Sequence, residues 1–510
     1  MKTKQSIKNS VISMIQYTII MLIGFISQKI FINILGTEYL GLNGLFTNII
    51  SMLGIVELGI GSAIIYNLYK PIVNNDYTTI NSLMKFYKKA YFIISIIIFV
   101  LGLCFIPFLP HFVGKVTIKI NIILIYLLFL LDIVASYFLS YKRSMLYADQ
   151  KNYIISLIHI VIYTLLNILQ LVFLYFTKNY YVYLVIKIIF RLIENIIITI
   201  YVNKKYKNLN VKNAENLDKN ILDDIVKKIK ALFFHKIGTF IILGTDNIII
   251  SRYLGLVAVG LYSNYYLIIN ALELLFGEAI NSLTPSVGHL LVENDIKKNY
   301  DVFKKIRFIN FWIATFTGIG LLILVQPFIT IWLGAEYLLS LSVLITLVIN
   351  YYQKMMRYTY SAFKNAAGIY YEDRFIPLLE SLTNIVVSIL LVNLIGLPGV
   401  FIGTIMSSLC LWCYSYPKFV YKSLFNRSYK SYIKETIQYF VLFLIVAVVT
   451  YIISSNIVVN NNFLQLIIDA FCVIIIPNVI IFALFRNTEN YKYFKSLLIK
   501  LLKRGKHEEA

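Results

Sequence analysis

Charged residues are scarce in this chain of 510 residues, and their scarcity excludes an ordinary soluble protein. Asp, Glu, Lys and Arg together make up 14% of the sequence, whereas hydrophobic residues make up 59%. In soluble domains, charged residues supply about a quarter of the total. Apolar runs of about 20 residues, each long enough to cross a bilayer as a helix, recur along the whole chain. The sequence therefore predicts an all-α, polytopic membrane bundle.

Cysteine is also rare, with four residues in the chain, and all four lie in apolar runs. Cys410 and Cys413 have a CxxC spacing, but they lie on one predicted membrane helix without an electropositive cap, so packing explains them better than redox chemistry. The sequence has no metal-ligand spacing, no Ser-His-Asp cluster and no phosphate-binding glycine loop followed by Lys-Ser or Lys-Thr. We therefore predict that the chain is not an enzyme, binds no metal or cofactor, and does not hydrolyse ATP. Any driving force comes from an H+ or Na+ gradient or from the substrate gradient.

The net charge of +22 would suggest a nucleic-acid partner in a soluble chain, but its placement indicates topology instead. We predict about fourteen membrane spans, of about 20 residues each. They cover, approximately, residues 10–33, 43–67, 88–110, 119–141, 152–176, 181–203, 230–251, 261–284, 307–332, 337–359, 375–395, 398–420, 433–454 and 463–486. With both termini in the cytoplasm, about 40 of the 47 Lys and Arg residues fall in inner segments, as the positive-inside rule requires. The charge thus predicts contact with the inner leaflet and no nucleic acid.

The stretch from Leu35 to Asp76 recurs 219 positions later, as Leu254 to Asp295. The matched positions include Gly36 with Gly255, Gly41 with Gly260, and Asn75-Asp76 with Asn294-Asp295. Because an even number of spans separates the copies, both have the same orientation, and such a parallel repeat is typical of transporters. We predict a six-helix lobe at residues 1–212, a second at 213–425, and two extra helices with a basic tail at 426–510.

Polar residues at membrane depth are costly, and by default they face a cavity or one another. Here they follow helical spacing on several predicted spans. The stripes include Thr47, Ser51, Gly54, Glu57 and Gly61 in the second span, Asp132, Ser136, Ser140 and Arg143 in the fourth, Lys187, Arg191 and Glu194 in the sixth, and Asn270, Glu273, Gly277, Asn281 and Thr284 in the eighth. Each stripe alone is equally compatible with helix packing, and Arg191 with Glu194 can form a neutral pair three residues apart. Their spread over both halves favours a water-accessible central cavity.

Three segments resemble known signatures. Val56-Glu-Leu-Gly-Ile-Gly-Ser-Ala63, followed by Tyr69-Lys-Pro71, resembles the second-helix signature of polysaccharide flippases. Thr245–Ser251 with Leu254-Gly255 and Val259–Asn264 resembles their seventh-helix signature, and Ala148–Tyr153 is similar to their loop after helix four. The chain thus resembles the oligosaccharide flippase branch of the multidrug/oligosaccharidyl-lipid/polysaccharide exporter superfamily, which also holds multidrug-and-toxin exporters and the lipid II flippase.

This resemblance implies two six-helix lobes around a lumen, working by alternating access. The implied substrate is an undecaprenyl-pyrophosphate-linked oligosaccharide, moved from the inner to the outer leaflet of a bacterial plasma membrane for capsule, exopolysaccharide or O-antigen assembly. Membrane lipid is an implied partner, as are the polysaccharide polymerase and the glycosyltransferases of the same pathway.

The flippases are described with a cationic lumen, whereas the membrane-depth acids of this chain outnumber its cations. Under the resemblance, the residues assigned to the pyrophosphate are Lys29, Arg191, Arg252, Arg357 and Lys364. The residues assigned to a polar lumen, to gating or to ion coupling are Glu57, Asp132, Asp246, Asn270 and Glu273. Either several acids are paired or protonated, or some couple transport to a cation. The second possibility keeps a cation-coupled multidrug exporter as the alternative function.

Overall fold

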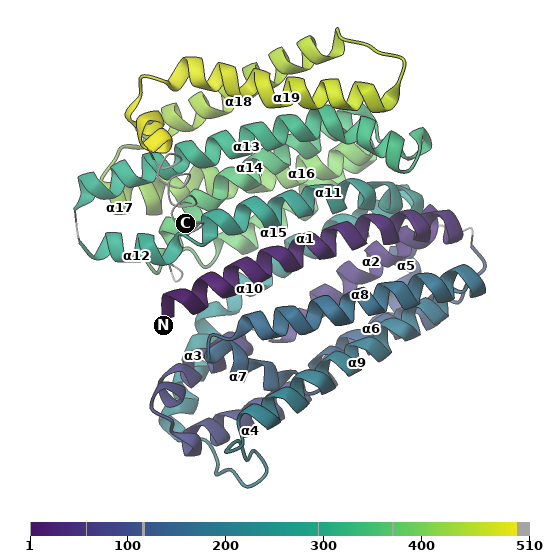
Figure 1. Cartoon of the computed structure of the whole chain (residues 1–510), viewed down its shortest axis with the longest axis vertical. Helices are drawn as coiled ribbons and strands as arrows, with labels where there is room; N and C mark the ends of the chain where they lie inside the picture. The colour runs from purple at the N-terminus through teal and green to yellow at the C-terminus, as the bar shows by residue number, and fades with distance from the viewer. Residues whose placement is uncertain (1, 58, 115–117, 294, 370–371, 497–510) are drawn as a thin grey trace, which may run out of the picture. The chain divides into compact units, whose positions relative to one another are not determined.

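The computed structural model describes residues 2–57, 59–114, 118–293, 295–369 and 372–496. These ranges contain helices and no strand, which confirms the predicted all-α class (Figure 1). Eleven helices within them are long and apolar enough to cross a membrane. Three further predicted spans coincide with helices α9, α10 and α14, which are not among these eleven. The total of about fourteen spans therefore stays a prediction, as does the side of the membrane on which the termini lie.

The chain divides into two compact units, Met1–Ser263 and Asn264–Ala510. The long helices of the first unit are α1 (Lys2–Leu35), α2 (Thr37–Leu53), α3 (Ile60–Val73), α4 (Tyr77–Phe105), α6 (Ile122–Tyr137), α8 (Asn152–Thr177), α9 (Tyr180–Lys205) and α10 (Lys219–Leu254). Its short elements are η1 (Gly54–Glu57), η2 (Ile106–Phe108), α5 (Leu109–Val113), η3 (Ser140–Lys142) and α7 (Arg143–Ala148). Within it, α8 packs against α1 and α9, and α9 also packs against α6 (Figure 1).

The second unit begins inside α11 (Leu256–Asn281). Its further long helices are α13 (Ile296–Trp332), α14 (Leu341–Ala366), α15 (Ile376–Ile395), α16 (Leu397–Cys410), α18 (Tyr429–Ser455) and α19 (Asn462–Phe485). Its short elements are α12 (Thr284–Val292), η4 (Ala335–Tyr337), the π-helix η5 (Leu411–Lys422) and α17 (Ser423–Phe425). Within it, the extra pair α18 and α19 packs against α13 (Figure 1).

The polar stretch after α9 is only partly a linker. Helix α10 already begins at Lys219, and it belongs to the first unit because it packs against α2 and α3. The intervening linker is held on α4, where the Lys85 ammonium donates to the carbonyl of Ala214 (2.7 Å) and the Asn210 amide donates to Asn81 Oδ1 (2.9 Å). The lobe boundary at residues 212–213, which rests on the repeat, stays a prediction.

The glycines that match across the repeat have the same structural tasks in both copies. Gly36 has φ 92° and ψ 171°, and Gly255 has φ 89° and ψ 170°. Such positive φ values favour glycine, because a Cβ would strain them. A Cβ on Gly41 would overlap the backbone of Leu256, and a Cβ on Gly260 would overlap the backbone of Thr37. Positions 37 and 256 are 219 apart, as are positions 41 and 260. The same two repeat positions therefore meet in both directions, and α2 crosses the first turns of α11 at a reciprocal contact.

The matched aspartates begin equivalent helices. The Asp76 carboxylate accepts the amide N–H of Thr79 at the start of α4 (3.1 Å). The Asp295 carboxylate accepts the amide N–H of Lys298 at the start of α13 (3.0 Å). Both bonds are N-caps, which satisfy amides that lack a partner in the first turn of a helix. Position 294 lies outside the described residues.

The prediction of one continuous helix over residues 43–67 is wrong. Helix α2 ends at Leu53, η1 follows, and Gly59 takes a left-handed conformation (φ 79°) before α3 starts at Ile60. The sequence predicted that residues 47–61 share one helical face, but the break places them on separate elements. The fourth predicted span is broken in the same way, because Leu139 is left-handed (φ 62°) between α6 and η3. Hydropathy does not detect such breaks, since the flanking residues stay apolar.

Candidate functional site

Two cations of the first unit share a single acid at membrane depth. Asp132, on α6, lies 3.1 Å from Lys187 Nζ and accepts a hydrogen bond from Arg191 Nε (3.3 Å). Both cations come from consecutive turns of α9, which packs against α6. Their side chains are 28% and 32% exposed, so each can reach a further anionic group. This group therefore has one excess positive charge in the membrane-spanning part of the unit.

A second charged group lies one turn further along α9. Buried Glu194 accepts a hydrogen bond from Arg143 (2.9 Å) and lies 3.2 Å from His159 Nδ1. Arg143 also donates to Asn195 (2.8 Å), whose amide donates to the free carbonyl of Phe138 (2.7 Å) at the broken end of α6. Arg191 and Glu194 are thus paired with different neighbouring helices, and the neutral pair between them that the sequence allowed is not formed.

Glu57 lies at the break between α2 and α3 and has hydroxyl partners. The Tyr91 hydroxyl donates to Glu57 Oε1 (2.7 Å), and the Tyr87 hydroxyl donates to that of Tyr91 (2.8 Å). Among the described residues, no cation forms an ion pair with Glu57. Gly61 allows this arrangement, because a Cβ there would meet Glu57 and both tyrosine hydroxyls. Glu57 therefore differs from Asp132 and Glu273, which both pair with a cation, in having no ion pair within the described part of the chain.

Helix α14 of the second unit carries three cations on one face, and each holds an acid from another element. Lys354 donates to Glu273 of α11 (2.6 Å), and Arg357 donates to both oxygens of Glu380 of α15 (2.7 and 3.4 Å). Lys364 pairs with Asp373, which is fully buried before α15 and also accepts from Ser415 of the π-helix (3.0 Å). The charges of Glu273, Arg357 and Lys364 are therefore compensated within this unit.

The remaining candidates differ in exposure. Lys29 on α1 and Arg252 on α10 are exposed, and neither makes a hydrogen bond or an ion pair within the described part of the chain. Asp246 on α10 is half-buried and has an interaction partner. Asn270 on α11 is half-buried beside Glu273. The two cations that the sequence assigned to a pyrophosphate and that remain without a partner are thus both in the first unit.

Sequence reasoning did not assign the partner residues Lys187, Lys354 and Asp373, nor a further ion pair between Arg307 and Glu435. Arg307, on α13, is 3% exposed and donates to Glu435 of α18 (2.5 Å). The spacing of Lys354, Arg357 and Lys364 in the sequence was a usable signal, because residues three and seven apart share a helical face. For Arg307 and Glu435 the sequence carries no such signal, since the two lie 128 positions apart.

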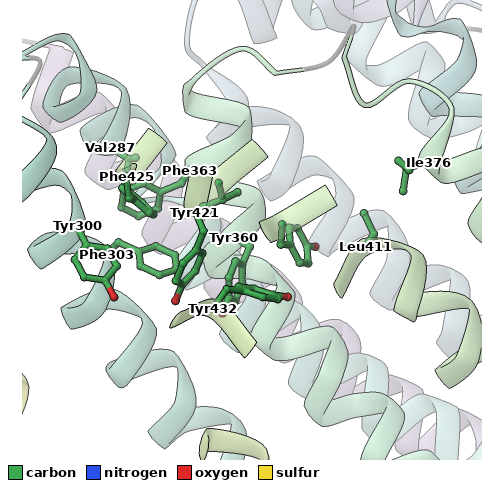
Figure 2. Close-up of a cluster of buried hydrophobic side chains, with 12 residues drawn as sticks. Val287, Tyr300, Phe303, Tyr360, Phe363, Ile376, Leu411, Tyr421, Phe425 and Tyr432 are labelled. Atoms are coloured by element: carbon green, nitrogen blue, oxygen red, sulfur yellow. The ribbon is translucent and has the colours of Figure 1, made fainter. Parts of the chain in front are cut away.

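A cluster of buried, mostly aromatic side chains lies at the π-helix (Figure 2), and its members Tyr300 and Tyr421 contact this ion pair. Tyr421 of the π-helix accepts from Arg307 and donates to Glu435 (2.9 Å), and Tyr300 donates to the other oxygen of Glu435 (2.6 Å). The buried members of the cluster are Val287, Tyr300, Phe303, Tyr360, Phe363, Ile376, Leu411, Tyr416, Val420, Tyr421, Phe425 and Tyr432. Aromatic packing and a paired charge thus fasten α18 to α13 and to the π-helix.

Comparison with known proteins identifies the fold. A family model described as "Polysaccharide biosynthesis protein" matches residues 6–290. A solved structure of the lipid II flippase MurJ has 16% identity and a TM-score of 0.65, covering 94% of this chain and 99% of its own. An inward-facing multidrug resistance MATE transporter of the MOP superfamily has 14% identity and a TM-score of 0.64, covering 79% and 94%. A Vibrio cholerae MATE transporter, VcmN, has 14% identity and a TM-score of 0.58, covering 83% and 100%. A sequence search of curated proteins finds no match.

Proposed function

This chain belongs to the polysaccharide biosynthesis protein family and is a multi-pass membrane protein with the fold of flippases and transporters, and we propose that it translocates a lipid-linked oligosaccharide. The substrate is an undecaprenyl-pyrophosphate-linked repeat unit, moved from the inner to the outer leaflet of a bacterial plasma membrane by alternating access. Its product feeds cell-surface polysaccharide assembly, with the polymerase and glycosyltransferases of that pathway as partners.

The observation that carries this proposal is the charge balance of the first unit. Lys187 and Arg191 share one carboxylate, and Lys29 and Arg252 have no partner among the residues described. A pyrophosphate is a compact anion that needs such uncompensated cations, and their attraction is stronger at membrane depth than in water. In the second unit, Arg357 and Lys364 already hold acids, so binding there requires an exchange of partners.

The first experiment replaces Lys29 and Arg252 separately by Gln in a strain that depends on this protein for its surface polymer. Loss of either cation should lower polymer export and cause lipid-linked repeat units to accumulate on the inner leaflet. Lys29→Arg should retain export, because it keeps the charge. Lys178→Gln is the matched control, since Lys178 is an exposed cation at the end of α8.

Immunoblots of membranes show whether each variant is inserted normally. Unchanged polymer levels in both Lys29→Gln and Arg252→Gln, at normal protein levels, would remove these residues from the pyrophosphate site. Equal losses in the Lys178→Gln control would show that general surface charge, and not a binding site, is responsible.

A cation-coupled drug exporter is the second candidate, and Glu57 is the observation that favours it. Glu57 accepts a hydrogen bond from Tyr91 and has no ion-pair partner in the described ranges, so it can take up a proton or another cation. The two functions separate in one comparison. A Glu57→Gln variant of a drug exporter loses drug resistance in a strain without surface polymer, whereas in a flippase the variant changes polymer export alone.

A further inference from the structure

Asp469 is a buried acid in the apolar helix α19. Its side chain is 5% exposed, and no ion pair reaches it within the described ranges. Ser454 donates to its Oδ1 (2.5 Å), and Gln465 donates to the same oxygen (3.0 Å). A buried negative charge without a counter-charge is costly in a membrane protein, so a cation from outside the chain would stabilise it.

A pocket of about 190 Å³ opens beside this carboxylate. Its walls are Leu322, Ile323, Gln326, Pro327, Leu341, Tyr451, Ser454, Ser455, Val458, Gln465 and Asp469. A water molecule takes up about 30 Å³ in the liquid, so the pocket accommodates a small organic group. Asp469 is the one charged residue among the wall residues described, and Tyr451 and Ser455 add hydroxyl-bearing side chains to the wall.

The pocket lies at one end of the second unit. Ser454 is the last residue but one of α18, Leu341 is the first of α14, and Pro327 lies in the last turns of α13. Asp469 is about 10 Å along α19 from its start at Asn462, given a rise of about 1.5 Å per residue. Trp332, the last residue of α13, is typical of the membrane–water interface. These positions place the carboxylate close to the level of lipid headgroups.

The loops at this end supply no counter-charge. Residues 333–340 and 456–461, which join α13 to α14 and α18 to α19, contain no Lys, Arg or His. A metal ion does not suit the walls well, because protein sites for hard cations are usually built from several carboxylates, and Asp469 is the one carboxylate among the wall residues described. A primary ammonium group suits them better, since it carries three donors on a carbon chain that apolar walls can cover.

We propose that this pocket binds the primary ammonium headgroup of a membrane phospholipid, with Asp469 as its counter-ion. The lipid source follows from the surroundings of the pocket, because α18 and α19 carry exposed apolar side chains over most of their length. Val458, at the pocket, is 79% exposed, and Phe463 at the start of α19 is 63% exposed. The acyl chains lie along this surface while the ammonium group enters between α13, α18 and α19. The site is independent of the proposed transport function.

The test compares lipid retention in nanodiscs containing phosphatidylethanolamine, phosphatidylcholine or phosphatidylglycerol, measured by native mass spectrometry of the full chain. Phosphatidylethanolamine should be retained in preference to phosphatidylcholine, which has the same charges but no N–H donors. Asp469→Asn should weaken this retention roughly tenfold, as expected for loss of one charge-assisted hydrogen bond. Asp301→Asn is the matched control, because Asp301 is an exposed acid at the opposite end of α13.

Each other outcome overturns the proposal. Equal retention of the two lipids by the wild type shows that no ammonium donor is recognised, even if the Asp469→Asn variant does not fold. If NaCl stabilises the protein in phosphatidylglycerol discs and phosphatidylethanolamine does not, the pocket is a metal-cation site instead. Stabilisation by free ethanolamine equal to that by the lipid identifies a soluble amine as the ligand.

Discussion

The partners of the acids at membrane depth explain why most of these acids can be buried. Sequence reasoning found more acids than cations and left pairing, protonation and cation coupling open. Asp132, Glu194, Glu273 and Glu380 all lie within ion-pair distance of a cation in the structure. Pairing satisfies a charge that would be costly to bury alone, so these residues first serve stability. Glu57 and Asp469 form no ion pair among the described residues, and each leads to a different hypothesis about a cation.

The ion pair between Arg307 and Glu435 is the interaction whose loss should cost most. Glu435→Ala leaves the Arg307 guanidinium buried without its acid, which should lower the free energy of unfolding by about 3–5 kcal/mol. Replacing both residues by Met should recover most of this loss, because no charge then remains unpaired. Thermal unfolding in detergent measures both effects. A double variant no more stable than Glu435→Ala would contradict this account.

At the level of helices, the repeat explains which residues had to match. Gly36 and Gly255 adopt the same positive-φ backbone, Gly41 and Gly260 allow the same crossing, and the two aspartates cap equivalent helices, α4 and α13. Apolar positions vary freely, because many side chains fill lipid-facing and packed surfaces equally well. The two copies differ in one helix. In the first copy, η1 and Gly59 interrupt the helix after Leu53, whereas in the second copy α11 continues to Asn281.

The crossing of α2 with α11 gives a symmetric prediction. Gly41→Ala and Gly260→Ala should each destabilise the chain by about 1–3 kcal/mol, because a Cβ would collide with backbone that cannot move alone. The control is Gly288→Ala in α12, where a Cβ meets nothing within 4 Å and the change should be neutral or stabilising. Thermal stability of the three variants decides the matter, and equal melting temperatures would show that the crossing tolerates the added methyl groups.

The cap of α4 should depend on pH. Hydrogen bonds from the Thr79 hydroxyl and amide lower the pKa of Asp76 below its ordinary value. Because the folded-state pKa is lowered, the cap stabilises the helix at pH values above the ordinary carboxylate pKa. This stabilisation is lost as the pH falls below about 4. Amide exchange in the first turn of α4 should therefore lose protection in acid. Asp76→Asn should keep protection independent of pH, and Asp76→Ala should lose it throughout; identical behaviour of all three chains would exclude capping.

For the chain as a whole, the distribution of Lys and Arg predicts a topology that labelling can test. Asn210, in the linker before α10, should lie in the cytoplasm, and Asn460, between α18 and α19, should lie outside. In a chain without its native cysteines, Asn460→Cys should react with an impermeant maleimide in intact cells, whereas Asn210→Cys should react only after permeabilisation. Both positions are exposed, so accessibility does not bias the comparison. The reverse pattern would invert the assigned orientation.

Membrane class, helix positions and the register of the repeat were readable from the sequence, because hydropathy, left-handed glycines and capping residues act over a few neighbouring positions. The breaks after Leu53 and before Leu139 were not readable, since the residues around them remain apolar. Only the tertiary structure decided which charges compensate one another. Arg191 and Asp132 lie 59 positions apart, and Arg307 and Glu435 lie 128 apart, so their pairing depends on which helices pack together. Burial makes a charge costly wherever it falls, but packing determines which partner satisfies it.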